Sequence, residues 1–184
     1  EQIELDAIRL VFVNGRFNAA RSSALPAGVV RFADANTEQQ ALIQQHLGKV
    51  VDSERHMFAA LSNAWAADGV LLHVARGHKL EKPVYIVNVS TAQANPVAAS
   101  QRVLVVLEDN AEAELIEHYA SDSVSQNGFV NSLTEVVVGN NAQVQHYRIN
   151  LEQEDLLHVG GVHVNLQRDA RFHGFTLAQG SRLK

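Results

Sequence analysis

The chain contains no cysteine among its 184 residues. This absence excludes disulfide bonds, thiolate metal sites and a cysteine nucleophile from the chain. Basic residues are also in the minority, because 15 Lys and Arg stand against 20 Asp and Glu, for a formal net charge of -5. Such a balance does not provide the positive surface that nucleic acids or anionic membranes attract. We therefore expect no nucleic-acid partner and no membrane partner.

Long apolar runs and aromatic side chains are scarce as well. No stretch approaches the roughly 20 apolar residues of a membrane-spanning helix, and no charged segment followed by an apolar one opens the chain. We expect a cytoplasmic protein. Hydrophobic residues still make up 46% of the chain, which is typical of folded globular proteins. The chain starts without methionine and ends straight after a strand-like run, so we expect an excised piece of a longer protein, truncated at its C-terminus.

The most informative feature of the sequence is a repeated corner. Residues 136–147 form a β-branched run, a polar corner and a second apolar run, and residues 164–175 repeat this pattern 28 positions on. Looser copies occupy residues 105–119, with one extra residue that predicts a bulge, and residues 72–86. Internal periods of about 20 to 50 residues indicate units that stack on one another.

The spacing of the copies indicates which kind of stack they form. The residues that close the first strand of each copy are 33, 31 and 28 positions apart: Val74, Leu107, Val138 and Leu166. A drifting period with a constant corner favours coils that stay in register while their loops vary in length. The sequence therefore predicts a mainly β protein built as a parallel β-helix, with neighbouring coils one strand spacing apart.

The N-terminal third has a different pattern. Asn14-Gly15 between apolar runs predicts a hairpin, residues 37–40 predict the start of a short helix, and a second helix is expected from about Asp52 or Ser53. The apolar stripe of that second helix consists of Phe58, Leu61 and Trp65. We expect residues 1–69 to form a small α/β cap on the open end of the coil and residues 70–184 to form the β-helix, incomplete at its C-terminal end.

Histidines are the first candidates for chemistry. His118 and His146 each precede a tyrosine in two copies, so stacking would place them about 4.8 Å apart, close enough to share a metal ion. Two imidazoles are too few for a closed metal site, however, and a ladder of side chains explains them equally well. His158 and His163 fall on opposite faces of a strand because their spacing is odd. We assign no metal-binding residue.

The acidic residues are the second candidates. Five carboxylates gather around one corner, and paired carboxylates can perform acid-base catalysis: Glu108, Asp109, Glu112, Glu114 and Glu117. A solvated corner also accounts for them. The sequence contains no nucleophile elbow and no phosphate-binding loop, since Gly139 and Gly160-Gly161 lack the residues that these motifs require. We assign no catalytic and no cofactor-binding residue, and the residues by themselves indicate a scaffold rather than an enzyme.

Several short segments, taken together, resemble the SufB/SufD family and lean towards its SufD branch. The resemblance is spread over residues 58–184, is weaker at residues 10–17, and is carried by residues 58–64, 68–70, 80–84, 102–105, 115–119, 134–136 and 142–147. It implies a right-handed parallel β-helix in a non-catalytic scaffold subunit of an iron-sulfur cluster assembly complex. It further implies pairing with a SufB-like paralogue and a SufC-like ABC-type ATPase, through regions largely outside this sequence.

The same resemblance implies that the cluster is handled by the whole complex and that this chain alone binds no cofactor. Two other interpretations remain open. A carbohydrate-active β-helix enzyme would use groove carboxylates, with Glu114 and Glu117 as the residues to test, although an aromatic content of 6% is low for sugar stacking. An antiparallel sandwich used as a binding module would show hairpin signals after Gly15, and we find none. We also expect some self-association, because an uncapped array end exposes unpaired strands.

Overall fold

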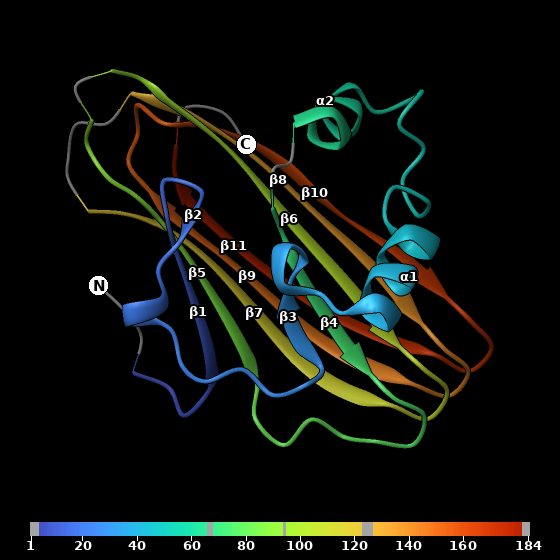
Figure 1. Ribbon diagram of the computed structural model, residues 1–184. Helices are drawn as coiled ribbons and strands as arrows, with labels where there is room; N and C mark the ends of the chain where they lie inside the picture. The colour runs from blue at the N-terminus through green and yellow to red at the C-terminus, as the bar shows by residue number, and fades with distance from the viewer. Residues whose placement is uncertain (1–3, 66–67, 94, 123–126, 182–184) are drawn as a thin grey trace.

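The structure is a computed structural model that describes residues 4–65, 68–93, 95–122 and 127–181. Two β-sheets face each other and run the length of the molecule (Figure 1). Sheet A contains, in spatial order, β11 (Arg171–Gly180), β9 (Gln143–Glu152), β7 (Glu112–Ser121), β5 (Val84–Ser90), β1 (Ile8–Val13) and β2 (Arg16–Phe17). Sheet B contains β10 (Leu157–Leu166), β8 (Gly128–Val138), β6 (Val97–Leu107), β4 (Val70–Val74) and β3 (Val29–Arg31).

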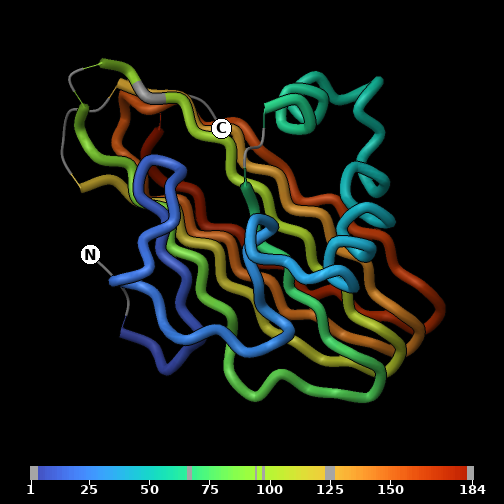
Figure 2. Tube along the Cα trace, viewed as in Figure 1, coloured from blue at the N-terminus to red at the C-terminus, as the bar shows by residue number. Residues whose placement is uncertain are grey.

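The chain winds between the two sheets as a parallel β-solenoid of about 3 turns. Each coil takes a strand of sheet B, turns a corner and continues as a strand of sheet A, and Figure 2 shows the coils lying one behind another. The expected register is confirmed, because Leu107 lies opposite both Val74 and Val138, and Val138 lies opposite Leu166. The repeat in the sequence is therefore the repeat of the fold.

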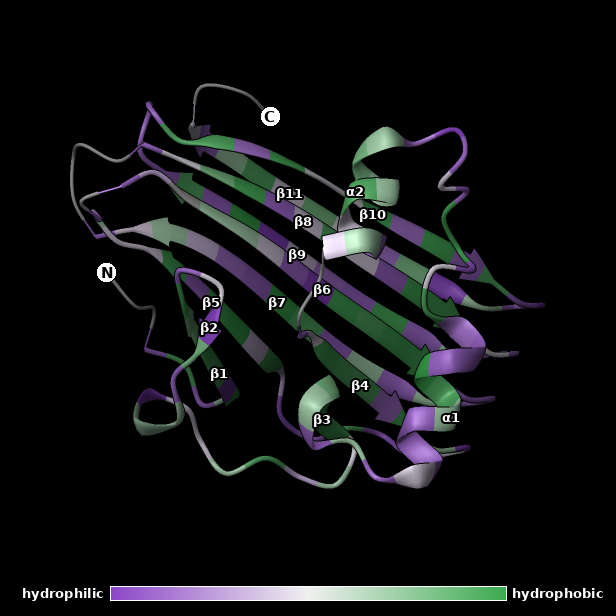
Figure 3. Ribbon diagram, turned by 45° about the horizontal axis from the view of Figure 1, so that its top comes forward, coloured by the Kyte–Doolittle hydropathy of each residue, from purple (hydrophilic) through white to green (hydrophobic). Residues whose placement is uncertain are grey.

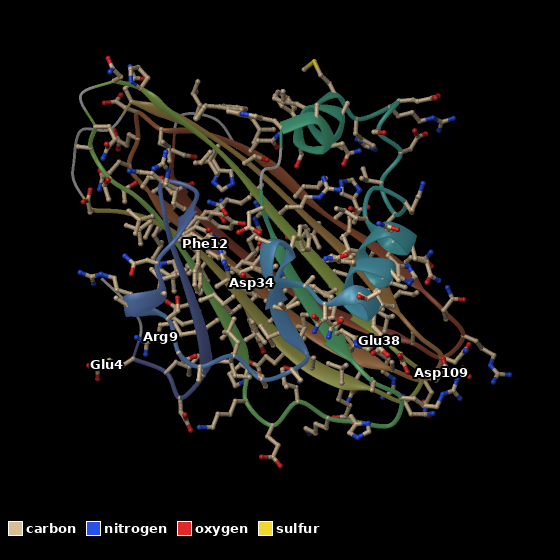
Figure 4. The ribbon with its side chains drawn as sticks, in the orientation of Figure 1. Glu4, Arg9, Phe12, Asp34, Glu38 and Asp109 are labelled. Atoms are coloured by element: carbon tan, nitrogen blue, oxygen red, sulfur yellow. The ribbon has the colours of Figure 1, made fainter. Side chains whose placement is uncertain are left out.

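The corners depend on residues that tolerate a left-handed backbone. Asn110, Asn141 and Asp169 occupy equivalent corner positions with φ of 60°, 54° and 59°. Asn and Asp tolerate this region better than other non-glycine residues. The side chain of Asn141 also donates a 2.9 Å hydrogen bond to the side chain of Asn110, which ties adjacent corners together. Gly139 has a different role, because a Cβ there would lie 2.7 Å from the backbone nitrogen of Asp109, a corner residue labelled in Figure 4.

Hydrophobic and hydrophilic residues alternate along parts of the strands, as the green and purple bands in Figure 3 show. Because alternate residues of a strand point to opposite faces, each sheet has an inner and an outer face. Val105 of β6 packs in the core between the sheets, while Leu104 and Val106 pack outside sheet B against Ile43 and Leu47. The apolar run of β6 is therefore covered on both faces.

The helices lie along the outer face of sheet B (Figure 1). Helix α1 (Thr37–His46) is capped by Asn36 in a capping box with Gln39, one residue earlier than the 37–40 motif suggests. Helix α2 (Met57–Trp65) begins later than expected. Its predicted apolar stripe is wrong at Leu61 and Trp65, which are 39% and 41% exposed, whereas Phe58 is partly buried with its ring centre 6.3 Å from that of Phe129. The buried face instead carries Ala59 and Ser62, because a helix lying this close to a sheet needs small side chains at the contact.

The N-terminal strands extend both sheets. The hairpin at Asn14-Gly15 is confirmed, with φ of 48° and 77°. Strand β1 pairs in parallel with β5, and β3 pairs antiparallel with β4.

Helix α2 contacts β6, β8 and β10 on the flank of the coil, whereas the sequence places its apolar stripe at the open end. Two short 3-10 helices are η1 (Ala19–Arg21) and η2 (Phe32–Asp34).

The division of the chain into residues 1–69 and 70–184 stays a prediction. Parts of both units, residues 1–3, 66–67, 94, 123–126 and 182–184, lie outside the described residues. Among the helices that the structure describes, none has the length and apolar character needed to traverse a lipid bilayer.

Candidate functional site

The inner face of the solenoid changes from apolar to polar along the strands. Near the corner the inward residues are apolar, as at Val136 and Val144. Further along the same strands they are polar or aromatic, and all are at most 6% exposed. We call this set the interior polar cluster: Glu117, Tyr119, Ser132, Thr134, His146, Arg148, Asn150, Glu152 and His158. Buried polar groups need partners, so the arrangement of their hydrogen bonds decides what the cluster can do.

Glu117 of β7 is the centre of one half of the cluster. Its carboxylate accepts hydrogen bonds from Tyr119 at 2.6 Å, from Thr134 at 2.6 Å and from Nε2 of His146 at 2.7 Å. Burial acts to raise the pKa of Glu117, but the hydrogen bonds from His146 and Thr134 and the charges of His146 and Arg148 together lower it to about 2. The carboxylate is therefore ionised at neutral pH, and it holds the proton of His146 on Nε2 because an ionised carboxylate only accepts.

Tyr119 closes this half. Burial and the neighbouring charge of Glu117 raise the pKa of Tyr119 well above its usual value, so its hydroxyl stays protonated and donates. The guanidinium of Arg148 lies 4.9 Å from the centre of the Tyr119 ring, in a cation–π contact. In each contact that the structure describes, the partner of the Glu117 carboxylate is therefore a hydrogen-bond donor or the cation Arg148.

In the other half of the interior polar cluster, a hydroxyl contacts an imidazole, and that imidazole contacts a carboxylate. Ser132 Oγ lies 2.6 Å from Nε2 of His158, and Nδ1 of His158 contacts Glu152. This is the order of groups in a Ser-His-acid triad. Ser132 is fully buried, however, and its Oγ also accepts from Nη2 of Arg148. A Cβ on Gly160 would lie 2.3 Å from that Oγ, so no space remains there for a substrate carbonyl.

A buried ion pair also lies on the outer face of sheet B. Nη2 of Arg102 donates at 2.6 Å to Glu135, and Nη1 donates at 3.1 Å to Ser62 of α2. Glu135 also accepts from the backbone nitrogens of Gly48 and Val50 at 2.8 and 3.0 Å. Burial lowers the pKa of Arg102, while the charge of Glu135 and its hydrogen bond oppose that shift. These contacts fasten α2 and the segment after α1 to the coil, which is a structural role.

The expected pairing of His118 with His146 is wrong. In the register of β7 and β9, His146 lies opposite Leu115, and His118 lies opposite Ile149. The copy at residues 105–119 has no bulge, because β7 and β9 pair without interruption from Glu112 to Ala120. His146 points inward to Glu117, whereas His118 lies on the outer face, with Nδ1 2.7 Å from the hydroxyl of Tyr85. The imidazoles of His118 and His146 therefore do not stack on each other.

Other histidines and the candidate carboxylates are also kept apart. His158 and His163 lie on opposite faces of β10, as predicted, with His158 in the cluster and His163 beside His56 at 5.3 Å between ring centres. Within the described part of the chain, no three His, Cys, Asp or Glu side chains gather closely enough to hold a metal ion. Glu117 is buried, and Glu114 lies on the opposite face of β7.

The remaining acidic residues lie around one corner of the coil, and each of them contacts a basic residue. Glu108 contacts His73 at 2.9 Å, Asp109 contacts Arg76 at 3.0 Å, and Glu112 contacts Lys79 at 3.1 Å. These three pairs lie partly or largely in solvent, so the corner is better described as a charged surface than as an acid-base site.

Sequence reasoning missed Ser132, Arg148 and Glu152. A signal for them exists in β9, where every second residue from His146 to Glu152 is polar or charged. Alternation of this kind normally marks a solvated face. Here the same residues face the interior, because the preceding Val144 belongs to the core and alternate residues share its face.

Two family descriptions match the chain. One is the SufBD core domain of SUF system FeS cluster assembly, over residues 88–184, and the other is the SufBD protein N-terminal region, over residues 3–86. An iron-sulfur cluster assembly SufBD family protein of Synechocystis sp. is 25% identical over 95% of the chain and 41% of its own length. The SufD proteins of Escherichia coli and Bacillus subtilis are 27% and 30% identical, over 95% and 61% of the chain. The chain spans 40% and 25% of the lengths of these two relatives.

Proposed function

The chain belongs to the SufBD family of the SUF system, whose role is iron-sulfur cluster assembly, and from that membership we propose that it acts as a non-catalytic scaffold subunit. The observation that carries the proposal is the match of the SufBD core description to residues 88–184, which include the three stacked coils from β6 to β11. A solenoid with a packed interior offers long, rigid outer faces, which suit protein contacts better than catalysis.

The proposed partners are a SufB-like paralogue and a SufC-like ABC-type ATPase. They are inferred from the family, whose description and relatives name SufBD proteins and SufD. The contacts with both partners are proposed to involve regions largely beyond this chain, since it spans less than half of these relatives. A cytoplasmic location is part of the same proposal.

The iron-sulfur cluster is proposed to be the product of the whole complex. This chain has no cysteine and therefore supplies no thiolate, the usual protein ligand of such clusters. We propose that it binds no cofactor of its own and that the cluster ligands come chiefly from a partner.

The contacts of the described carboxylates support a non-catalytic role over a carbohydrate-active enzyme. Glycoside hydrolysis needs two carboxyl groups facing one bond across roughly 5 to 10 Å of open groove. Glu117 is buried and bound by three donors, and Glu114 is on the other face of β7. The two residues considered for that chemistry thus cannot reach one substrate from the same side.

The test is co-purification of the full natural protein. It is expressed with an affinity tag beside the SufB-like and SufC-like proteins of the same genome, with each partner also omitted in turn. We expect a complex of all three subunits, recovered at a fixed ratio by size-exclusion chromatography. A full-length protein that elutes alone in the presence of both partners would contradict the proposal. Polysaccharide turnover that is lost on Glu117→Gln but not in a folded control would point to the enzyme instead.

A further inference from the structure

A cavity of about 310 Å³ lies on the outer face of sheet B, beside the start of α2, which packs over β8 and β10 (Figure 1). Its walls come from the segment that enters α2 and from outward positions of the two strands, and they include His56, Asn131 and His163. The cavity is separate from the solenoid interior, because Asn131 and His163 alternate along their strands with the inward residues Ser132 and Val162.

Two imidazoles meet in this cavity. The ring centres of His56 and His163 are 5.3 Å apart, and the ring planes make an angle of 66°. With Zn–N bonds of about 2.0 to 2.1 Å and a tetrahedral angle, the centres of two imidazoles bound to one ion lie roughly 5 Å apart. An edge-to-face contact between rings has a similar separation. The distance therefore suits a shared metal ion, and the surroundings of the ring nitrogens decide between the two explanations.

The ring nitrogens of this pair are free to bind a ligand. Within the described part of the chain, neither ring has a hydrogen bond or an ion pair. The ring of His146, by contrast, is bound to Glu117. His56 is exposed and His163 is partly buried, so solvent reaches the pair. A Cβ on Gly161 would lie 3.1 Å from Nε2 of His163, and the missing side chain thus leaves room for this ring at the cavity wall.

The charges around His163 favour its neutral form. Burial lowers the pKa of His163, and the neighbouring His56 and Arg102 lower it further, against the opposing charge of Glu135. A neutral imidazole keeps a lone pair on one nitrogen, which is the form that binds metal ions. His163 is therefore ready to act as a ligand at neutral pH.

The backbone holds both residues in place. The nitrogen of His56 donates to the carbonyl oxygen of Asp52 at 3.1 Å, and the carbonyl oxygen of His56 accepts from the nitrogen of Ala59 at 2.9 Å. His163 lies opposite Glu135 in the register of β10 and β8. An ion bound by both imidazoles would consequently tie the start of α2 to β10.

We propose that His56 and His163 together bind a divalent first-row transition metal ion, with Zn²⁺ as the representative case. Imidazole is a ligand that several of these ions share. Two side-chain ligands leave the remaining positions to water, so the site is open and the ion exchanges, unlike a resident cofactor. The inference is independent of the scaffold function, because it rests on contacts within the chain alone. A ring contact without an ion is the competing explanation.

The experiment counts the metal ions that the full natural protein binds at neutral pH after treatment with a chelator. Isothermal titration calorimetry follows Zn²⁺, and visible absorption follows Co²⁺. We expect the unmodified protein to bind one ion more than His163→Gln. His56→Gln should lose the same ion, and the double variant should lose no further one. His173→Gln removes an exposed imidazole of β11 and should leave binding unchanged.

A second measurement reports the link between α2 and β10. An ion that binds only the folded state stabilises it, so Zn²⁺ should raise the melting temperature of the unmodified protein and of His173→Gln. The rise should be absent or at least several-fold smaller in His56→Gln and His163→Gln. Far-UV and near-UV circular dichroism establish that each variant is folded.

Three results would overturn the proposal. The first is an equal number of bound ions in the unmodified protein and in His163→Gln. The second is an ion that is lost in one of the two single variants but not in the other. The third is a pair of losses that add in the double variant, because each imidazole would then bind its own ion. Each of these results would mean that the two rings only touch.

Discussion

Glu117 of β7 and His146 of β9 form a buried hydrogen bond of 2.7 Å between residues 29 positions apart in the sequence. Both side chains are at most 2% exposed. The bond joins two neighbouring coils inside the solenoid, where no solvent is available to replace either partner. Breaking a buried pair by removing one partner is strongly destabilising, since the other polar group is left without compensation. The interior polar cluster is therefore expected to set much of the pH dependence of stability.

The substitution Glu117→Gln tests this expectation. It removes the charge that Arg148 and His146 face, and we expect the free energy of unfolding at pH 7 to fall by about 3 to 5 kcal/mol. Urea denaturation followed by circular dichroism measures the change. Glu114→Gln, on the outer face of the same strand, is the matched control and should change stability by less than about 0.5 kcal/mol. Equal effects of the two substitutions would contradict the described network.

The pH dependence of stability gives a second test of the same residue. The pKa of Glu117 is about 2 in the folded protein, below its ordinary value of 4.5. A depressed folded pKa contributes stability that is fully present above the unfolded value and is lost as pH falls through the folded one. We therefore expect about 3 kcal/mol of stability to disappear between pH 5 and about pH 2. The Glu117→Gln variant should lack that part of the acid limb in urea titrations at each pH, and a wild-type slope in the variant would contradict the assignment.

The pair formed by Arg102 and Glu135 is expected to hold the helical segment onto sheet B. Glu135→Gln weakens the bonds to Arg102 and to the backbone of Gly48 and Val50, and we expect a loss of about 3 to 5 kcal/mol. Hydrogen exchange should accelerate at the amides of these two residues before the strands open. Asp52→Asn is the control, because its pair with Arg55 is largely exposed and should contribute less than about 1 kcal/mol. Unchanged amide protection in Glu135→Gln would argue against the anchor.

The sequence predicts the stacking of the coils well, because corner chemistry recurs at positions that must overlie one another. It fails on the two histidines for a geometric reason. His118 follows Ala111 by 7 residues, and His146 follows Ala142 by 4. The difference, 7 − 4 = 3, is odd, so the side chains point to opposite faces even though the dipeptides look alike. Register is set by the corner, and not by the resemblance of two short motifs.

The interior polar cluster is harder to predict, since it departs from the rule that inward positions are apolar. Arg148 and Glu152 can be buried only because partners from β8 and β10, such as Ser132 and His158, reach them across the solenoid. Those partners belong to different coils and sheets, so no local pattern reveals them. The face of α2 is missed for a related reason, because the contact with Arg102 selects Ser62 over the larger Leu61.

Gly160 and Gly161 are adjacent, but we expect substitution by alanine to destabilise the protein to different extents at the two positions. A Cβ on Gly160 would lie 2.3 Å from both the carbonyl oxygen and Oγ of Ser132, whereas a Cβ on Gly161 would meet the ring of His163 at 3.1 Å. We expect Gly160→Ala to lower the free energy of unfolding by about 1 to 3 kcal/mol through overpacking. Gly161→Ala should change it by less than about 1 kcal/mol, because a partly exposed side chain can move aside. Chemical denaturation of both variants measures the difference, and equal losses would mean that the interior is less tightly packed than described.

Self-association at the last coil is expected from the exposed residues of β11. This strand is the edge of sheet A, and its outer face carries Phe175 and Leu177, which are 56% and 40% exposed. An edge strand with apolar side chains pairs readily with a second copy, and an added lysine opposes such pairing. Sedimentation velocity of this chain at several concentrations should show concentration-dependent association, reduced at least several-fold by Leu177→Lys. The control Leu61→Lys places the same charge on the exposed part of α2, away from the edge, and should leave association unchanged. If the chain stays monomeric at every concentration, the edge of β11 does not pair and the prediction is contradicted.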